Sequence, residues 1–557
     1  MITKGRLCAT AAVSAMTLAT LAGPPAAMAD TNPPAGVPPT ISADALPTWQ
    51  INGVVWSQVV VNNIVYVTGS FTKARPPGVA PGGTGEVTAL NIFAYDIRTG
   101  NRVSGFHHSL NAQGRAITAT PDGSKIFIGG DFTSVDGIAR GHLAGFSTAT
   151  FALDPTVKPT VSNVVRTLTA SNSTLFVGGG YGSVNGVARN SLSAVSVSTG
   201  SLLGWKPKVD NGTVWSMVLA PGGTRVIVGG SFTTLNTGTT LDNGYGRSAY
   251  GMGSLDATTG SSQPWAATQR IRDATSTGAI TSLRTDGQRI YGSGYAYGTG
   301  SSFEGTFAAE PSTGNITVVN DCHGDTYDVL PLGQVLYSVS HAHDCRWVRS
   351  FPDTSPRVRW QRALAQTTTP TTTNIGPDSY GWNYNGLPAS AVLHWFPQFR
   401  AGSYTGQSQA AWSLAGNTSY VSFGGEFPGL NGINQQGLTR MAVRSVATNK
   451  RGPTYATLPA RAIPATTATR TGSGTIKVSF GTAWDYDNNR LTYQVLRNGN
   501  TTTPVYTTTA NTNFWTLPTL SFTNSGLPPG SSNTYQVRIT DPFGNTLLSP
   551  VSNKVTA

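Results

Sequence analysis

Short apolar segments rich in β-branched and aromatic residues recur along most of the chain, and several of them end in a pair of glycines. The clearest are KIFIGG (125–130), TLFVGG (174–179), RVIVGG (225–230) and SYVSFGG (419–425). In two of these cases a tight turn, Pro121-Asp122-Gly123 or Pro221-Gly222-Gly223, precedes the segment, and a further apolar segment lies before the turn. Such runs bounded by turn residues are typical of antiparallel β-strands. The pattern predicts an all-β protein.

These segments belong to a longer internal repeat. The full copies are GGDFTSVDGIARGHLAGF (129–146), GGGYGSVNGVARNSLSAV (178–195) and GGEFPGLNGINQQGLTRMAV (424–443), and shorter copies begin at Gly69 and Gly229. Equivalent aromatic residues, Phe132, Tyr181 and Phe232, lie about 50 residues apart. Four short strands in each repeat of this length are typical of one blade of a β-propeller. The glycine pairs suit positions where two backbones come close together.

Counting the repeats gives seven predicted blades. Their innermost strands start near Trp56, Arg115, Arg166, Trp215, Ala279, Tyr327 and Trp412. The blades at Ala279 and Tyr327 lack a clear motif and are placed by spacing alone, so six or eight blades remain alternatives. We therefore expect a seven-bladed β-propeller over residues 49–455, with an insertion at 366–410 before the last blade.

The repeat resembles the delta-60 repeat family of bacterial propellers, most closely in the copies at 129–146 and 178–195. The resemblance spans roughly residues 50–455. It implies a propeller fold and leaves the activity open, because one fold serves many functions.

The repeat stops after Arg451-Gly452-Pro453. The segments TIKVSF (475–480), RLTYQVLR (490–497) and TYQVRITD (534–541) alternate apolar and polar residues, as half-buried strands do. Gly526-Leu527-Pro528-Pro529-Gly530 before Tyr535 resembles the tyrosine-corner segment of fibronectin type III domains. We expect a fibronectin type III-like β-sandwich over 460–557, with Trp484 in its core. The oxygen-rich run 485–489 could bind calcium, but a polar turn is the favoured interpretation.

The N-terminus has the features of an export signal. Lys4 and Arg6 precede an apolar stretch, and Ala27-Met28-Ala29 forms a small-residue cleavage site. Residues 1–29 are therefore predicted to be a signal peptide and 30–48 a linker. No later stretch approaches the roughly 20 apolar residues that a membrane span needs. We expect a secreted, extracellular protein that does not insert into membranes.

Composition narrows the classes of partner. The net charge is +12, yet charged residues make up only 11% of the chain and Lys and Arg form no run. Nucleic-acid binding is therefore not expected. Cys322 and Cys345 are the two cysteines left after the signal, and in an exported protein they are expected to form a disulfide.

The starts of the predicted innermost strands supply the first candidate site. Four are aromatic (Trp56, Trp215, Tyr327, Trp412) and two are Arg115 and Arg166. Around the mouth of a central channel they would suit a sugar that carries carboxylate or sulfate, because rings stack on sugar C–H surfaces and guanidinium groups pair with oxyanions. The alternative is that these side chains plug the channel and pack against one another.

The predicted insertion is rich in aromatic residues, and Trp382, Trp395 and Arg400 are its candidates for the same ligand site. Long loops that are not simply polar often serve binding. Part of this aromatic set is expected to form a small core of the loop itself.

A second candidate site surrounds the predicted disulfide. It would bring His323 and Asp325 close to His341 and His343, which alternate along a strand and so share a face. Three imidazoles and a carboxylate could hold zinc or another divalent metal. The alternative is a polar patch fixed by the disulfide, with no ion.

These observations favour a secreted, non-catalytic and monomeric protein that recognises an extracellular glycan or polysaccharide and requires no cofactor. Glutamates are scarce and no hydrolase motif is present, so no catalytic residue is assigned. One alternative is a metal-assisted polysaccharide hydrolase or lyase that uses the histidine cluster. Another is a structural protein of the extracellular matrix or cell surface.

Overall fold

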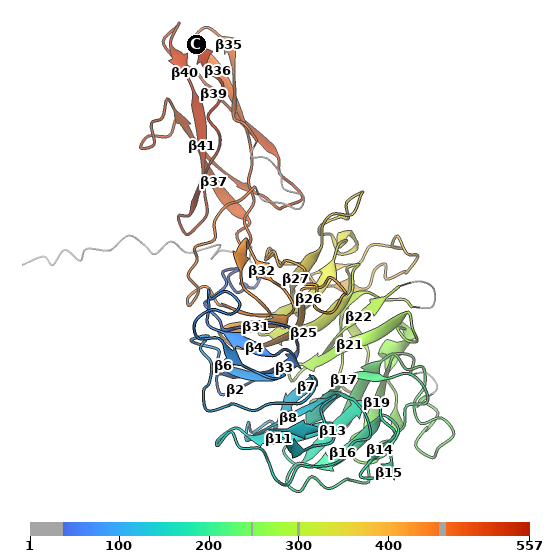
Figure 1. Cartoon of the computed structure of the whole chain (residues 1–557). Coiled ribbons are helices and arrows are strands. Elements are labelled where there is room, and N and C mark those ends of the chain that lie inside the picture. The colour runs from blue at the N-terminus through green and yellow to red at the C-terminus, as the bar shows by residue number, and fades with distance from the viewer. Residues whose placement is uncertain (1–36, 247–248, 298–300, 456–463) are drawn as a thin grey trace, which may run out of the picture.

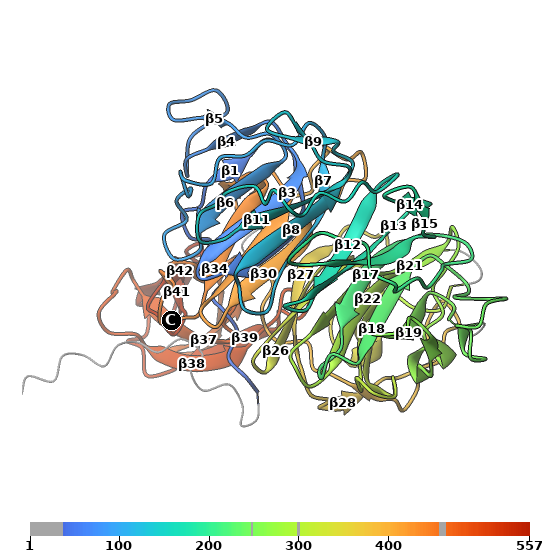
Figure 2. The ribbon, with the colours of Figure 1, turned by 90° about the horizontal axis from the view of Figure 1, so that it is seen from below.

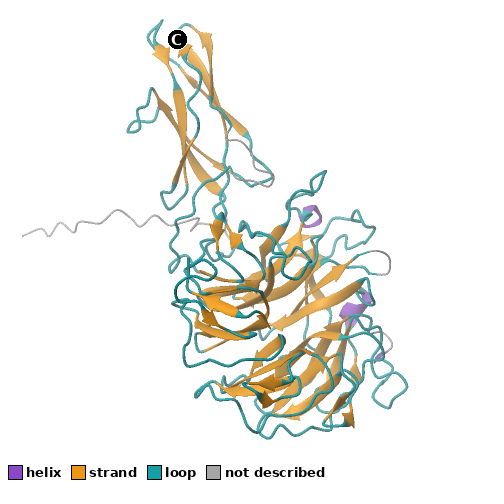
Figure 3. Cartoon of the chain, viewed as in Figure 1, coloured by secondary structure: helices purple, strands orange, loops and turns teal. Residues whose placement is uncertain are grey.

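The computed structural model describes residues 37–246, 249–297, 301–455 and 464–557. The predicted signal peptide and the first part of the predicted linker lie outside this range. Antiparallel strands and loops make up nearly all of the structure (Figure 3), and helix is limited to short 3-10 turns such as η2 (Ala266–Gln269) and η3 (Arg346–Val348). Among the described residues, no helix has the length and apolar character needed to cross a membrane. The all-β prediction is confirmed.

Between residues 54 and 442 the described chain forms seven small antiparallel sheets. Each sheet has an inner strand, and each inner strand contacts the inner strands of two other sheets, so that the seven form a closed cycle in which the first contacts the last. Figures 1 and 2 show the sheets arranged around this inner set. The inner strands are β2 (Val54–Val61), β7 (Gly114–Ala119), β12 (Val165–Ala170), β17 (Val214–Leu219), β21 (Gly278–Thr285), β25 (Thr326–Leu332) and β30 (Ala411–Asn417).

Each sheet continues outward from its inner strand through a middle and a third strand. The middle strands are β3 (Ile64–Ser70), β8 (Lys125–Gly130), β13 (Thr174–Gly179), β18 (Arg225–Gly230), β22 (Ile290–Ala296), β26 (Val335–Ala342) and β31 (Tyr420–Gly425). The third strands are β6 (Ile92–Asp96), β11 (Leu143–Ser147), β16 (Leu192–Ser196), β19 (Met252–Asp256), β23 (Gly305–Ala309), β27 (Gln361–Thr367) and β34 (Leu438–Ala442). Two sheets add a fourth strand, β20 (Ser262–Gln263) or β24 (Ile316–Asp321).

The glycine pairs are the last two residues of the middle strands β8, β13, β18 and β31, at points where neighbouring atoms leave no room for a side chain. A Cβ atom on Gly130 would lie 2.4 Å from the carbonyl oxygen of Gln113, and one on Gly129 would lie 2.3 Å from a methyl carbon of Val165 in the next sheet. Real Cβ contacts are not this short. The repeat motif therefore follows from the close packing of one sheet on the next.

Some of the loops between the strands of these sheets contain small two-stranded hairpins. Three of them, β9–β10 (Ser134–Val135, Ile138–Ala139), β14–β15 (Ser183–Val184, Val187–Ala188) and β32–β33 (Gly429–Leu430, Ile433–Asn434), turn at the Asp-Gly or Asn-Gly pairs of the repeat. Both residues of each pair have positive φ, such as 50° at Asp136 and 78° at Gly137, which two-residue hairpin turns of this kind require. The other small pairings are β1 (Gln50–Ile51) with β4 (Lys73–Arg75), β4 with β5 (Val87–Thr88), and β28 (Thr372–Thr373) with β29 (Pro388–Ala389).

Residues 37–48, the described part of the predicted linker (30–48), pair with the N-terminal sheets and do not form a free linker. Ile41 and Leu46 form β-bridges with Val443 and Arg440 at the outer edge of the β30–β31–β34 sheet. Ile41 is only 1% exposed. Residues 41–46 therefore add to the outer edge of the last of the seven sheets, where Ile41 and Leu46 are buried and their backbone groups find partners.

The C-terminal residues form a separate pair of sheets with its own apolar core. One sheet has the order β35–β36–β39 and the other β38–β37–β41–β42, and Figure 1 shows them as an elongated module that projects from the rest of the chain. Their strands are β35 (Thr467–Gly472), β36 (Thr475–Gly481), β37 (Arg490–Arg497), β38 (Tyr506–Asn511), β39 (Thr519–Asn524), β41 (Tyr535–Thr540) and β42 (Thr546–Leu548). A short pair, β40 (Ser532–Asn533) and β43 (Val555–Thr556), lies beside them.

The two parts of the chain are joined by a packed interface. Trp484 is fully buried, but it lies in the same apolar cluster as Trp395 and Phe396 of the N-terminal part, and not in the core of the C-terminal sheets. In the run 485–489, the Tyr486 carbonyl accepts a hydrogen bond from the Phe396 N–H at 2.8 Å, and Asp487 accepts one from the Ala43 N–H at 2.6 Å. This run thus joins the two parts of the chain.

Candidate functional site

A β-bulge interrupts every one of the seven inner strands near its start. In each strand the pairing with the middle strand skips one residue, for example Trp56 between Val55 and Ser57. A bulge redirects the side chain of its extra residue. The skipped residues are Trp56, Arg115, Arg166, Trp215, Thr281, Tyr327 and Trp412.

All seven skipped residues line one cavity of about 630 Å³, and all seven are half-buried. Four further residues complete its wall: Tyr295, Tyr297, Asp325 and Gln407. A second cavity of about 120 Å³ is lined by the same seven residues together with the next residues of the inner strands. The site is therefore built from residues that lie far apart in the sequence, and it takes one side chain from every sheet.

Aromatic rings form two groups in the cavity wall. Trp412 contacts Trp56 edge to face, with ring centroids 5.2 Å apart, and Tyr327 at 4.3 Å. Trp215 lies 5.8 Å from Tyr295 in the second group. Hydrogen bonds fix two of the indoles, because Trp56 donates to Gln113 at 2.9 Å and Trp412 donates to Glu426 at 3.1 Å. The rings pack against one another within each group and still leave the space between the groups open.

The two arginines of the cavity differ in their pairing. Arg115 forms an ion pair with Asp131 at 3.1 Å. Arg166 makes no hydrogen bond or ion pair with any residue that the structure describes, and its guanidinium lies 6.0 Å from the ring centroid of Trp215. Burial lowers the pKa of Arg166 and the nearby Arg115 lowers it further, although guanidinium stays charged in proteins. The Asp131 carboxylate, which pairs with Arg115, acts in the opposite direction and raises the pKa of Arg166. The cavity thus presents a guanidinium that is not directly paired with a carboxylate.

One side of the cavity carries a hydrogen-bonded set of ionisable groups. The Tyr327 hydroxyl lies 2.9 Å from Nδ1 of His341, and the Gln409 amide lies 3.0 Å from the same atom. Burial lowers the pKa of His341 to about 4, so its imidazole is neutral at pH 7. Burial also raises the pKa of Asp325 to about 6, against the effect of the Tyr327 hydroxyl, which lowers it.

An ion pair between a half-buried arginine and a buried aspartate lies in the wall of the smaller cavity. Arg284 donates to Asp328 at 2.9 Å, and Asp328 also accepts hydrogen bonds from the Ser282 hydroxyl and the Leu414 N–H. The attraction of Asp328 raises the pKa of Arg284. This pair links three inner strands, β21, β25 and β30, below the ring of skipped residues.

The structure brings six of the sequence-predicted ligand residues together in the cavity: Trp56, Arg115, Arg166, Trp215, Tyr327 and Trp412. The fifth inner strand, β21, begins near Ala279 as predicted, but its bulge residue, and the one that lines the cavity, is Thr281. Ala279 is fully buried and pairs with Tyr295. Without a motif in this repeat, spacing alone placed the position two residues too early.

The residues predicted from the insertion do not line this cavity. Trp395 is fully buried against Tyr337 and Phe423, where it can contact no ligand. Arg400 is exposed and donates hydrogen bonds to Pro428 and Asn434. Trp382 packs 5.3 Å from Tyr380, beside the core. From this connection the cavity receives only Gln407.

Cys322 and Cys345 form the predicted disulfide, with Cα atoms 4.3 Å apart. The four predicted metal ligands beside it do not converge on one point. Nε2 of His323 lies 2.7 Å from Asp378, Nδ1 of His343 lies 3.3 Å from Asp353, and Nε2 of His341 lies 4.0 Å from Asp325.

The alternation assumed for His341 and His343 fails for a local reason. Strand β26 ends at Ala342, and its pairing with β27 is irregular between Val339 and Ala342. His341 therefore faces the set of groups around Tyr327, while His343 lies 4% exposed beside Asp353.

Sequence reasoning missed four residues of the cavity wall: Thr281, Tyr295, Tyr297 and Gln407. The alternation of Tyr295 and Tyr297 at the end of β22 is the one signal that points to a shared face. Thr281 and Gln407 carry no distinguishing motif.

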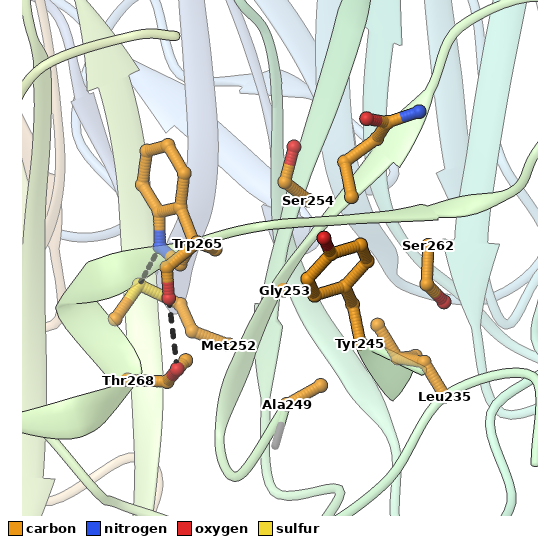
Figure 4. Close-up of a pocket in the computed structure, with 10 residues that line it drawn as sticks. Leu235, Tyr245, Ala249, Met252, Gly253, Ser254, Ser262, Trp265 and Thr268 are labelled. Carbon is orange, nitrogen blue, oxygen red and sulfur yellow. Dashed lines mark hydrogen bonds between the residues drawn. The ribbon is translucent and has the colours of Figure 1, made fainter. Parts of the chain in front are cut away.

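A much smaller pocket of about 10 Å³ lies outside the ring, among Leu235, Tyr245, Met252 and Trp265 (Figure 4). The Trp265 indole N–H donates to the Met252 sulfur at 3.4 Å, and the Thr268 hydroxyl donates to the Trp265 carbonyl at 2.9 Å. A space of this size holds no more than a water molecule. It is a packing defect and not a ligand site.

Comparisons with known proteins give little beyond this geometry. No family model and no curated protein matches the chain. Of the solved structures, 208 chains match. One belongs to the crystal structure of the mitotic checkpoint complex, with 10% sequence identity, a TM-score of 0.38, and coverage of 77% of this chain and 99% of that one. A likeness at this level says nothing about the function of this chain.

Proposed function

We propose that this chain is a secreted, non-catalytic protein that binds an extracellular glycan in the 630 Å³ cavity. The observation that carries the proposal is the composition of the cavity wall. Each inner strand contributes the residue at its bulge, and six side chains of the wall are Trp or Tyr. Flat rings stack on the C–H faces of sugars. The unpaired Arg166 extends the proposal to glycans that carry carboxylate or sulfate groups, because guanidinium binds such oxyanions well.

The proposed architecture is a seven-bladed β-propeller of the delta-60 repeat type, followed by a fibronectin type III-like sandwich. The cyclic contacts of the inner strands and the β-bridges from residues 41–46 to the last of the seven sheets support the propeller. The strand order of the two C-terminal sheets and their own apolar core support the sandwich.

The direct test is a glycan array and a polysaccharide pull-down with the purified protein. We expect binding to a subset of glycans, with preference for acidic ones. If no neutral or acidic glycan binds at concentrations up to the millimolar range, the proposed function is wrong.

Arg166→Gln should weaken binding of acidic glycans about 10-fold and leave neutral glycans nearly unaffected. A charge-assisted hydrogen bond contributes about 1.5–3 kcal/mol, and solvent in the half-open cavity reduces this value. Isothermal titration at low and high salt measures the change, and the difference between the two proteins should shrink as salt increases. The matched control is Arg490→Gln, an exposed position on the C-terminal module. Equal losses in both variants would mean that overall charge and not the cavity attracts the ligand.

A metal-assisted polysaccharide hydrolase or lyase has less support. Of the four residues expected to hold the metal (His323, Asp325, His341 and His343), only Asp325 lines the cavity, and His323 is 1% exposed. Chemistry on a polysaccharide requires contact between the reacting groups and the substrate.

A further inference from the structure

Three side chains around His323 gather at a single buried point. One ligand atom from each of Asp321, His323 and Asp378 lies within 4.8 Å of the other two, and these side chains are 1%, 1% and 0% exposed. Nε2 of His323 lies 2.7 Å from Asp378 and 3.6 Å from Asp321. They come from the end of β24, the loop that follows it, and the connection between β27 and β30.

The neighbours of this cluster orient two of the three side chains. One carboxylate oxygen of Asp378 accepts hydrogen bonds from the N–H groups of Tyr380 and Trp382 at 2.9 and 2.7 Å, which turns the other oxygen towards His323. The Tyr380 ring stacks on the imidazole at 4.1 Å. Fixed orientation by outer groups is what a metal ligand needs.

Asp321 has no such support. Both of its carboxylate oxygens are buried, and neither has a hydrogen-bond partner among the residues that the structure describes. Burial, followed by the nearby Asp378, raises the pKa of Asp321 to about 8. A buried carboxylate with no partner is costly, and a second carboxylate close to it adds to that cost.

We propose that Asp321, His323 and Asp378 bind one Zn²⁺ ion in a closed, structural site. One imidazole and two carboxylates are a suitable set for zinc, and the second oxygen of Asp321 or a water molecule completes four-coordination. Tetrahedral zinc places its ligand atoms about 3.3 Å apart, so the 3.6 Å separation fits and the 2.7 Å separation must widen by about 0.6 Å. The ion would neutralise the two carboxylates and satisfy Asp321.

The site lies next to the disulfide and to the cavity. His323 follows Cys322, and two residues later Asp325 lines the cavity wall. Zinc would thus hold in place the loop that carries Asp325 and leads into the bulge at Tyr327. The proposal does not depend on glycan binding.

Elemental analysis of the purified protein tests the proposal. We expect one zinc per chain in the wild type, loss on prolonged treatment with a chelator, and stoichiometric uptake when ZnCl₂ is titrated back in a calorimeter. Asp321→Asn and Asp378→Asn should each weaken zinc uptake at least 10-fold. Asp353→Asn, a nearby acidic position outside the cluster, should leave it unchanged.

The wild-type measurement needs no variant to fold. If the chelator-treated wild type takes up no zinc, Asp321 is simply a protonated acid and the proposal is wrong. It is also wrong if Asp353→Asn loses as much zinc as Asp321→Asn. A thermal midpoint that falls with chelator and recovers with ZnCl₂ in the wild type, but does not change in Asp321→Asn, supports the structural role.

Discussion

Replacing Trp215 and Trp412 together by alanine should weaken glycan binding about 100-fold. The two indoles lie in the two separate aromatic groups of the cavity wall, so the double variant removes a stacking surface from each. Each lost ring removes about 1–2 kcal/mol of contact, from the apolar area it covers and from the directed interaction of its face. A total of about 3 kcal/mol corresponds to roughly two powers of ten in the dissociation constant. Isothermal titration with the tightest glycan from the array measures it.

Trp360→Ala is the matched control for this double variant. Trp360 is the same residue type, is 37% exposed and does not line the cavity. We expect wild-type affinity for the control and thermal midpoints within a few degrees of the wild type for both proteins. A double variant that is folded and binds with unchanged affinity would remove the proposed site.

Trp395→Ala should destabilise the protein by about 3–5 kcal/mol and leave the intrinsic affinity for glycan unchanged. Trp395 is fully buried between Tyr337 and Phe423, so its removal leaves a large cavity in the core. The cost arises from lost contacts and from space that the surrounding side chains cannot fill. Chemical denaturation followed by tryptophan fluorescence and circular dichroism measures the shift of the midpoint.

Trp395→Phe separates the contribution of ring packing to stability from that of the indole N–H. The indole N–H of Trp395 is buried without a hydrogen-bond partner among the described residues, so phenylalanine keeps most of the ring and removes an unsatisfied donor. We expect less than half the destabilisation of the alanine variant. A Trp395→Ala protein of normal stability that no longer binds glycan would contradict the structural role and place this residue in the site.

The sheets could be predicted from the sequence because the same steric restriction recurs in successive repeats. A side chain on Gly129 would collide with the next sheet, and one on Gly130 with the backbone at the start of its own inner strand. Selection for glycine at each such point leaves a visible repeat. The edge strand around Ile41 lies outside the repeat, so its place in the last sheet could not be seen from periodicity.

The ring of cavity residues could be predicted in part for the same reason. The bulge sits at a constant place in each inner strand, so aligning the strand starts also aligns the redirected side chains. In the fifth sheet no motif fixes the register, so spacing points to Ala279 although the bulge lies at Thr281. Such a shift keeps the face but moves the residue along the strand.

The contacts made by the connection between β27 and β30 could not be predicted from residue types. Trp395 and Trp382 are equally aromatic in the sequence, yet one is fully buried and the other only partly buried. Asp378 meets His323 from 55 residues away, through a loop without repeat character. Tertiary packing alone decides such pairings, so the grouping of Asp321, His323 and Asp378 required coordinates.

The crystal structure of the protein bound to an acidic oligosaccharide tests the central claim most directly. The account predicts a sugar ring stacked on Trp215 or Trp412 inside the cavity, with its carboxylate or sulfate within hydrogen-bond distance of Arg166. An oligosaccharide seated on another surface, with the space between Trp215 and Trp412 empty, would contradict it.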